Sequence, residues 1–198
     1  MWVNANSSAI KDADAICFYE DFVGYVLTGK RKVSYSSAAR SMAFDIHKRC
    51  WSKELLDYAE IDISQLSEPC DAGTVIGTIL PEMAEKLHLN PNMQVVVGGH
   101  DQSCAALGSG LHNMEVGECG MGTCEFMFMR LPEAKSDAVM IDSDLTCVPY
   151  VLPGAYLTSL EVTTCGILKN WCMDTVLKSF KQECEAVGKN VFEEVDKR

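Results

Sequence analysis

The chain has 198 residues, with 17 basic and 28 acidic side chains, so its formal net charge is −11 when the histidines are neutral. Apolar residues make up 47% of the sequence and charged residues 23%, which is ordinary for a globular protein and excludes a disordered chain. The acidic balance argues against nucleic acid as the main partner, because clustered Lys and Arg are needed to bind a phosphate backbone.

Membrane insertion and secretion are not indicated either. No stretch approaches the roughly 20 apolar residues that a membrane span needs. The first residues have no basic region followed by an apolar one, so no signal peptide is predicted. We therefore expect a cytoplasmic protein that binds neither nucleic acid nor membrane. A homo-oligomer is compatible with the sequence, which does not decide the oligomeric state.

The first half of the sequence is predicted to be mainly helical. Residues 12–27 form an amphipathic run, and Gly29 follows at the position of a helix C-cap. The Ser-rich residues 30–37 suit a loop or a short edge strand. Further along, Ser52 is placed to cap a second helix and Pro81 to open a third.

A short strand is predicted over residues 93–97, which are uncharged and rich in Val and therefore suit a buried strand. The strand ends at Gly98-Gly99, and His100-Asp101-Gln102 follows directly. An Ala-rich helix is expected over residues 103–107.

The second half is predicted to be richer in strands. Its expected elements are two strands around a Gly-rich turn over 116–130, further strands over 145–151 and 155–161 around Pro153-Gly154, a helix over 168–180 and a charged, helix-prone tail over 181–198. This change of character predicts a boundary near residues 111–114, which divides the chain into 1–112 and 113–198.

Asp101 is the most informative residue for function. In open α/β sheets, ligands gather at the carboxyl ends of the strands, and a carboxylate there can act as a general base towards a hydroxyl group. The alternative is that Asp101 only caps the helix, because Asp is a favoured N-cap residue. Gln102 can hydrogen-bond a polyol or simply lie in the solvated first turn. His100 is interpreted as a structural neighbour, since no Ser or Cys nucleophile in an elbow pattern accompanies it.

The turn Gly120-Met121-Gly122-Thr123 is the second candidate site. Two glycines allow the backbone to approach an anion, and consecutive amide groups in a turn can bind phosphate. The alternative is a plain β-hairpin turn, which also favours glycine. Gly166, before the predicted helix 168–180, is the third candidate, because the start of a helix offers backbone donors to an anion. It can equally be a turn that only begins a helix.

Ten cysteines are spread along the chain without any C-x-x-C pair, so neither a zinc ribbon nor a dithiol motif is indicated, and no metal site is predicted. Most are interpreted as buried thiols that behave as small apolar side chains. Cys119 and Cys124, which flank the Gly-rich turn, leave a redox pair as the alternative.

The order of these features closely resembles the FGGY family of carbohydrate kinases, which includes xylulokinases, gluconokinases and glycerol kinases. The similar residues are Gly98-Gly99-His100-Asp101-Gln102, Ala105-Ala106-Leu107-Gly108-Ser109-Gly110, Gly117, Gly122-Thr123 and Gly166-Ile167-Leu168-Lys169-Asn170-Trp171. The stretch from Asp21 through Leu27-Thr28-Gly29 is similar to the family's D-x-x-x-x-x-L-T-G motif, and Ser36 to Asp45, Trp51 and Leu55-Leu56 follow in the family's order. The resemblance covers nearly the whole chain.

The resemblance implies an α/β protein with the actin-like, ribonuclease H-like ATPase fold, in partial form: the end of lobe one (1–112) and the start of lobe two (113–198). It implies an ATP-dependent kinase that phosphorylates a sugar or polyol hydroxyl, with ATP and Mg²⁺ required. Asp101 matches the family's general base, and Gln102 matches a residue that contacts the polyol. Gly122 and Thr123 match the phosphate-binding hairpin, and Gly166 and Asn170 match positions near the ATP phosphates.

Two departures from the family pattern limit this prediction. The N-terminal Asp-x-Gly-Thr phosphate hairpin and the C-terminal Gly-Gly-Gly adenosine segment of these kinases are not found in the sequence. A full kinase of this type has roughly twice this length or more, as the resemblance implies. We therefore expect little or no kinase activity from this polypeptide alone. The alternatives are a non-catalytic fragment or pseudokinase that binds a sugar or a protein partner and, more remotely, a thiol-based metal or redox protein.

Overall fold

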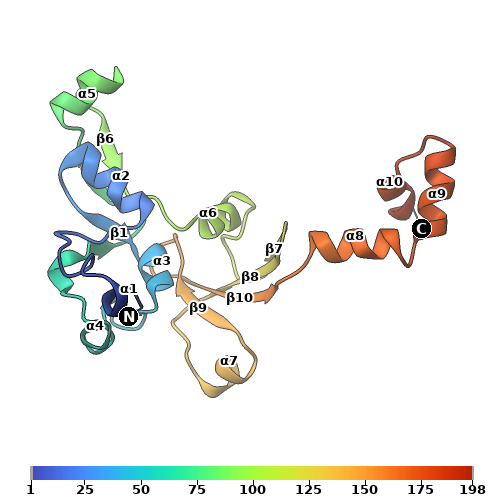
Figure 1. Ribbon diagram of the computed structural model, residues 1–198, viewed down its shortest axis with the longest axis horizontal. Helices are drawn as coiled ribbons and strands as arrows, with labels where there is room; N and C mark the ends of the chain where they lie inside the picture. The colour runs from blue at the N-terminus through green and yellow to red at the C-terminus, as the bar shows by residue number, and fades with distance from the viewer. Residues whose placement is uncertain (1, 198) are drawn as a thin grey trace. The chain divides into compact units, whose positions relative to one another are not determined.

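The computed structural model describes residues 2–197 (Figure 1). By their internal contacts, these residues form two units. The first unit contains the residues up to Glu118 together with Phe128–Ser159, and the second contains Cys119–Met127 together with the residues from Leu160 onward. The chain passes from one unit to the other within three strands, β7 (Gly117–Met121), β8 (Glu125–Leu131) and β10 (Tyr156–Val162).

Short helices and strands alternate along the first part of the chain. They are α1 (Trp2–Asn6), α2 (Tyr19–Thr28), β1 (Lys32–Ser34), α3 (Tyr35–Ala38), η1 (Ala39–Ser41), β2 (Phe44–Asp45), β3 (Cys50–Trp51), α4 (Lys53–Ala59), η2 (Ile63–Gln65), β4 (Glu68–Cys70), β5 (Val75–Thr78), α5 (Pro81–Leu87), β6 (Gln94–Val96) and α6 (Asp101–Gly108). The later elements are β7 (Gly117–Met121), β8, α7 (Ala138–Asp142), β9 (Thr146–Pro149), β10, α8 (Gly166–Asp174), α9 (Lys178–Ala186) and α10 (Val191–Val195).

Helix α2 begins later than the predicted run 12–27. Its C-terminus is as predicted, because Gly29 adopts the left-handed conformation and its amide donates to the Tyr25 carbonyl oxygen. The residues before Tyr19 are held in a non-helical path by a distant segment. The amide of Ile16 donates to the Gln65 carbonyl oxygen at 2.8 Å, and the Gln65 side chain donates to the carbonyl oxygens of two residues before Ile16.

The main core of the first unit lies under strands β1, β2 and β3. It consists of Val33, Ala38, Phe44, Trp51 and Leu56, all buried. The rings of Phe44 and Trp51 meet edge to face with centroids 5.8 Å apart. Full burial of a Val, Leu or Phe side chain contributes roughly 1.5–3 kcal/mol to the stability of a fold. As predicted, Ser52 caps α4, and Pro81 opens α5.

Strands β1 and β4 pair in parallel, whereas β5 and β6 pair antiparallel. Helix α2 contacts β1, β5 and β6 (Figure 1). The prediction of a buried strand over 93–97 is right about the strand and wrong about its burial. The side chain of Val96 is half exposed, whereas Val97, just after β6, is buried. A two-stranded sheet with one helix against it leaves alternate side chains of β6 uncovered.

Strands β2 and β3 pair antiparallel, and the later strands form a sheet in the order β7-β8-β10-β9. Strands β9 and β10 pair antiparallel around the predicted turn, in which Gly154 has a φ of +78°. Arg49 links this sheet to the N-terminal core, because its guanidinium lies over the rings of Tyr35 and Tyr156 at 5.4 and 5.3 Å. Helix α7, between β8 and β9, was not predicted.

The predicted helix 168–180 is interrupted. Helix α8 ends at Asp174, where the Thr175 hydroxyl donates to the Trp171 carbonyl oxygen at 2.6 Å, and α9 begins at Lys178. A hydroxyl that bonds back to the preceding turn competes with the helical pattern. The predicted inner face is also wrong in part: Met173 is buried, but the side chains of Trp171 and Val176 are more than half exposed.

The interpretation of most cysteines as buried is wrong, since Cys184 is buried whereas Cys50 and Cys104 are exposed. The Cys119 thiol donates to Glu125 Oε1 at 3.2 Å and the Cys124 thiol to the Thr163 carbonyl oxygen at 3.4 Å. The two thiols suggested as a redox pair thus have separate partners. None of the helices in residues 2–197 combines the length and apolar character that a membrane crossing requires.

Candidate functional site

Asp101 lies at the turn where strand β6 gives way to helix α6, as the sequence predicted. Asp101 is the first residue of the helix, and the preceding His100 occupies the N-cap position without making a side-chain cap. The Asp101 side chain is 86% exposed. A carboxylate in this position is accessible to a hydroxyl group from solution, as a general base must be.

The Asp101 carboxylate has two neighbours in its own turn. Its Oδ1 accepts a hydrogen bond from the Gln102 amide at 2.7 Å, so it does satisfy one donor of the first helical turn. The His100 Nε2 atom lies 3.4 Å from the same oxygen. Burial lowers the pKa of His100, and the nearby Asp101 carboxylate opposes that shift only in part. The neutral imidazole is therefore the favoured form at neutral pH. The Gln102 side chain is half-buried.

Gly99 allows this turn to pack against the rest of the first unit. A Cβ atom on Gly99 would lie 2.3 Å from Val151 Cγ1 and 3.1 Å from Ser36 Oγ, distances that a real side chain could not adopt without displacing its neighbours. Gly98 has open space at the equivalent position. The two glycines of the predicted turn thus have different roles, and only Gly99 is required by close packing.

The second candidate site lies in the second unit, where the tip of the β7–β8 hairpin contacts the start of α8. The Gly166 amide donates to the Gly122 carbonyl oxygen at 3.0 Å, and the Cys165 amide donates to the Thr123 carbonyl oxygen at 2.9 Å. A Cβ atom on Gly166 would lie 3.1 Å from the Gly122 oxygen. The structure therefore brings Gly122, Thr123 and Gly166 together, although they are separated by about forty residues of chain.

These contacts define which donors remain for an anion. A helix leaves its first four amide groups without intrahelical partners. Two of them, from Cys165 and Gly166, already donate to the hairpin. The following amides, of Ile167 and Leu168, are the ones that a phosphate oxygen can use. Asn170 follows Gly166 by four residues, so it lies on the same face of α8, and its side chain is exposed.

Metal ligands are sparse in the part of the chain that the structure describes. It contains no group of three or more His, Cys, Asp or Glu side chains placed to hold a metal ion. Mg²⁺ keeps several waters and is often bound through one or two carboxylates and the phosphates of a nucleotide. The donor set of residues 2–197 therefore does not by itself fit a resident Mg²⁺ ion.

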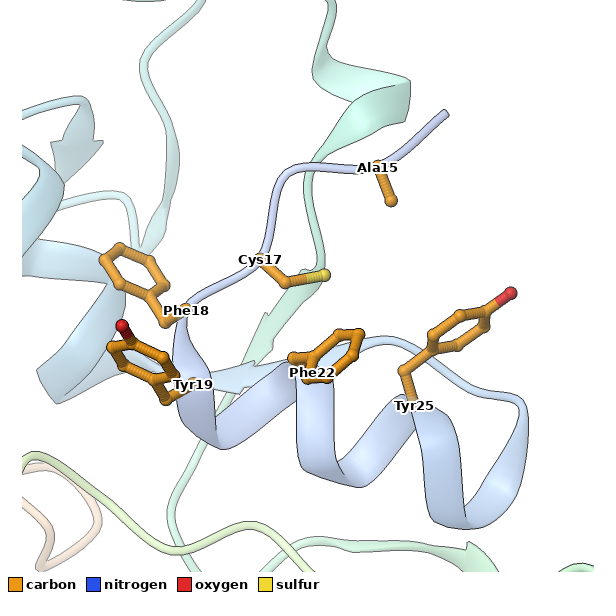
Figure 2. A pocket seen from close by; sticks show the side chains of 6 residues that line it. All are labelled: Ala15, Cys17, Phe18, Tyr19, Phe22 and Tyr25. Atoms are coloured by element: carbon orange, nitrogen blue, oxygen red, sulfur yellow. The ribbon is translucent and has the colours of Figure 1, made fainter. Parts of the chain in front are cut away.

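A cavity of about 610 Å³ in the first unit does not have Asp101 in its lining. It is lined by side chains of α2 and of the segment before it. Figure 2 shows Phe22 and Tyr25 pointing from α2 towards Ala15 and Cys17. This largely apolar lining offers few partners for the hydroxyl groups of a sugar. It is a poorer match for a polyol than the turn at Asp101.

A group of polar residues near Asp101 was missed by the sequence analysis as a functional feature. Ser36 accepts a hydrogen bond from the His100 amide at 3.0 Å, across 64 residues of chain. Ser36 is hydrogen-bonded to Ser34, and the Ser34 hydroxyl donates to the Glu20 carboxylate. The Ser-rich stretch 30–37 was the only available signal, and it was interpreted as a loop or edge strand.

Comparison with known proteins identifies the family. Residues 1–108, more than half of the chain, match the model of the N-terminal domain of the FGGY family of carbohydrate kinases. The chain belongs to this family. Similar curated FGGY relatives are the xylulose kinase of Lactococcus lactis, 30% identical over 88% of this chain, and the autoinducer-2 kinase of Escherichia coli K12, 26% identical over 97%. The chain spans about a third of their length, 34% and 36% respectively.

Solved structures of kinases show the same fold. The xylulose kinase from Lactobacillus acidophilus matches 98% of this chain with a TM-score of 0.80 and 21% identity. Glycerol kinase from Plasmodium falciparum, solved with ADP, matches 89% with a TM-score of 0.75 and 17% identity. This chain covers 37% and 36% of those two structures. The chain therefore has part of the actin-like ATPase fold that the sequence predicted.

Proposed function

We propose that this chain provides the general base and a phosphate-binding hairpin of an ATP-dependent carbohydrate kinase. The observation that carries the proposal is the solvent-exposed carboxylate of Asp101 at the end of β6, in a chain that belongs to the FGGY family. Gln102, next to it, is proposed to contact the sugar or polyol. The acceptor is proposed to be a ketose or polyol, because two of the similar proteins are named xylulose kinases.

In the proposed reaction, Asp101 accepts the proton of the sugar hydroxyl group. The hydroxyl oxygen then forms a bond to the γ-phosphorus of ATP, the bond to the β-phosphate oxygen breaks, and ADP leaves. Such transfer depends mainly on positioning and on neutralising charge. Mg²⁺ is proposed to enter bound to the ATP phosphates, since residues 2–197 lack a metal cluster of their own.

The second unit is proposed to bind the ATP phosphates. The hairpin residues Gly122 and Thr123 contact the start of α8 through the amides of Cys165 and Gly166. This contact supports the proposal, because it sets the remaining amides of the α8 N-terminus beside the exposed Thr123. Asn170, one turn further along α8, is proposed to lie near the same phosphates.

The two lobes are proposed to meet near residue 112, with residues 1–112 in the sugar-binding lobe and 113–198 in the nucleotide-binding lobe. The family model of the N-terminal domain extends to residue 108, which supports this boundary. The contacts divide the chain differently, since Phe128–Ser159 packs with the first unit.

The proposal is tested by measuring sugar binding and phosphorylation with the purified chain. Calorimetry against xylulose and a panel of ketoses and polyols reports binding, and a coupled ADP assay with Mg²⁺ and ATP reports turnover. We expect Asp101→Asn to abolish sugar binding. Glu85 is an exposed acid on α5, and we expect Glu85→Gln to leave sugar binding unchanged. In any longer polypeptide that contains this chain and turns over, Asp101→Asn should lower kcat by about 10²–10⁴-fold. Equal turnover in that variant would contradict the role of Asp101.

A further inference from the structure

A chain of hydrogen bonds joins helix α2 to the turn that carries Asp101. The His100 amide donates to Ser36 Oγ at 3.0 Å, and Ser36 Oγ lies 3.0 Å from Ser34 Oγ. The Ser34 hydroxyl and the Ser34 amide both lie 3.0 Å from Glu20 Oε1, to which they donate. Two serine hydroxyls thus connect helix α2, the end of β1, helix α3 and the turn before α6.

The donors and acceptors of these groups fix the direction of the chain. The Ser34 hydroxyl has one proton, which it donates to Glu20 Oε1, an oxygen that can only accept when the carboxylate is charged. Ser34 Oγ must therefore accept from the Ser36 hydroxyl. Since the Ser36 proton is used in this way, Ser36 Oγ is left to accept the His100 amide. Every donor points towards Glu20, and bonds aligned in one direction strengthen one another.

The packing around the two serines makes this chain of hydrogen bonds rigid. The side chains of Ser34 and Ser36 are buried, with 0% and 2% of their surface exposed. Water cannot readily replace either hydroxyl, and an unpaired buried hydroxyl would cost stability. Gly99, whose missing Cβ leaves room for Ser36 Oγ, brings the turn close enough for the contact.

We propose that Glu20, Ser34 and Ser36 are positioning residues for Asp101. They hold the backbone of His100, and the residue that follows it is the proposed general base. This inference rests on the proposed function, because it assigns these residues to the site around Asp101. A base that is misplaced by about 1 Å loses much of its effect. A fixed backbone at position 100 therefore helps to keep the Asp101 carboxylate in position for proton transfer.

The first experiment measures the backbone of the folded chain and needs no reaction. Amide hydrogen exchange by NMR is compared for His100 in wild type, Ser36→Ala and the control Ser37→Ala, whose hydroxyl lies outside this hydrogen-bond chain. We expect the His100 amide to exchange about fivefold faster in Ser36→Ala. The Gln102 amide, which donates to Asp101 Oδ1, should change its chemical shift. The Val97 amide, bonded to the Thr74 carbonyl oxygen, serves as an internal reference.

A second pair of variants separates hydrogen bonding from charge and does not alter the buried serines. Glu20→Gln keeps an oxygen that can accept from the Ser34 amide and hydroxyl, whereas Glu20→Ala removes it. We expect Glu20→Ala to speed exchange at His100 and Glu20→Gln to restore wild-type exchange. Unchanged exchange at His100 in both Ser36→Ala and Glu20→Ala would overturn the inference. If Ser36→Ala does not fold, amide exchange at His100 in Glu20→Ala alone tests the inference.

A separate measurement distinguishes failure of this inference from failure of the proposed function. Xylulose affinity is measured by calorimetry for the same variants and for Asp101→Asn. If exchange responds as expected but Asp101→Asn keeps full sugar affinity, the proposed role of Asp101 fails while the hydrogen-bond chain stands, and these residues then position a turn without function. If Asp101→Asn abolishes binding but exchange at His100 is unaffected by Ser36→Ala and Glu20→Ala, the positioning role fails alone.

Discussion

The Gly166 amide donates to the Gly122 carbonyl oxygen at 3.0 Å, and a Cβ atom on Gly166 would lie 3.1 Å from that same oxygen. This contact joins the tip of the β7–β8 hairpin to the start of α8 and leaves little room for a side chain at position 166. The proposed phosphate site therefore depends on glycine at position 166 for packing as well as for donors.

Gly166→Ala should separate the hairpin tip from α8. Alanine favours the helix by about 1 kcal/mol relative to glycine, but its methyl group would press against the Gly122 oxygen. We expect faster exchange of the Cys165 amide, which donates to the Thr123 carbonyl oxygen. Gly122→Ala is the control, since a Cβ there meets only the Cys124 oxygen at an ordinary 3.9 Å. Unchanged protection at Cys165 together with higher stability would contradict this.

Gly99→Ala should destabilise the first unit by about 1–3 kcal/mol, the usual cost of overpacking. The added methyl group would collide with Val151 and press on Ser36. Gly98→Ala is a matched control one residue away, with open space around the added atom, and should be neutral or slightly stabilising. Urea unfolding of both variants measures the difference. Equal effects would show that the packing of Gly99 is not limiting.

Asp21→Asn should increase stability at pH 7 by about 1 kcal/mol. The Asp21 side chain is 2% exposed, and within residues 2–197 its Oδ1 has no hydrogen-bond partner. Burial raises the pKa of Asp21 above its usual value of 3.8. The folded state therefore binds a proton that the unfolded state has lost, and this contribution to stability falls as pH rises from about 4 through the raised pKa.

The pH dependence gives Asp21→Asn its own control. The advantage of the variant over wild type should be largest at neutral pH and should shrink as pH falls towards 4, because the carboxyl of folded wild type then becomes protonated and neutral. Thermal or urea unfolding at several pH values measures this. Parallel stability curves for the two proteins between pH 4 and 7 would refute the assignment to Asp21.

Tyr150→Phe should cost about 1–3 kcal/mol, because it leaves a buried carbonyl group without its donor. The Tyr150 hydroxyl donates to the Leu111 carbonyl oxygen at 2.9 Å, and both residues are buried. Burial raises the pKa of Tyr150 to about 12. Wild type should lose further stability above pH 10, where the unfolded tyrosine ionises first, and the variant should lose less. Tyr58→Phe, at an exposed position, should have almost no effect.

The caps and turns could be predicted from the sequence because their causes are local. Gly29 and Pro81 act through their own backbone preferences, and Ser52 through an amide three residues away. The start of α2 was predicted too early because Gln65, far along the chain, holds the preceding segment. The half-exposed Val96 was predicted as buried, since a run of valines does not reveal how many strands surround it.

The candidate site was predictable as a set of residues but not as a set of contacts. Asp101 and Gly166 could be selected because each begins a helix after glycine-rich or polar turns. The contact of Gly166 with Gly122 depends on tertiary structure, and so does the contact of Ser36 with His100. No local pattern could indicate that Ser34 and Ser36, more than 60 residues earlier in the chain, support the turn at Asp101.

The directional hydrogen-bond chain from His100 to Glu20 has a consequence for how such sequences diverge. The two serines and the glutamate are hydrogen-bonded in series, so a substitution at one of them removes a partner of the next. Among related sequences, substitutions at positions 20, 34 and 36 should therefore occur together, as correlated replacements, rather than one at a time.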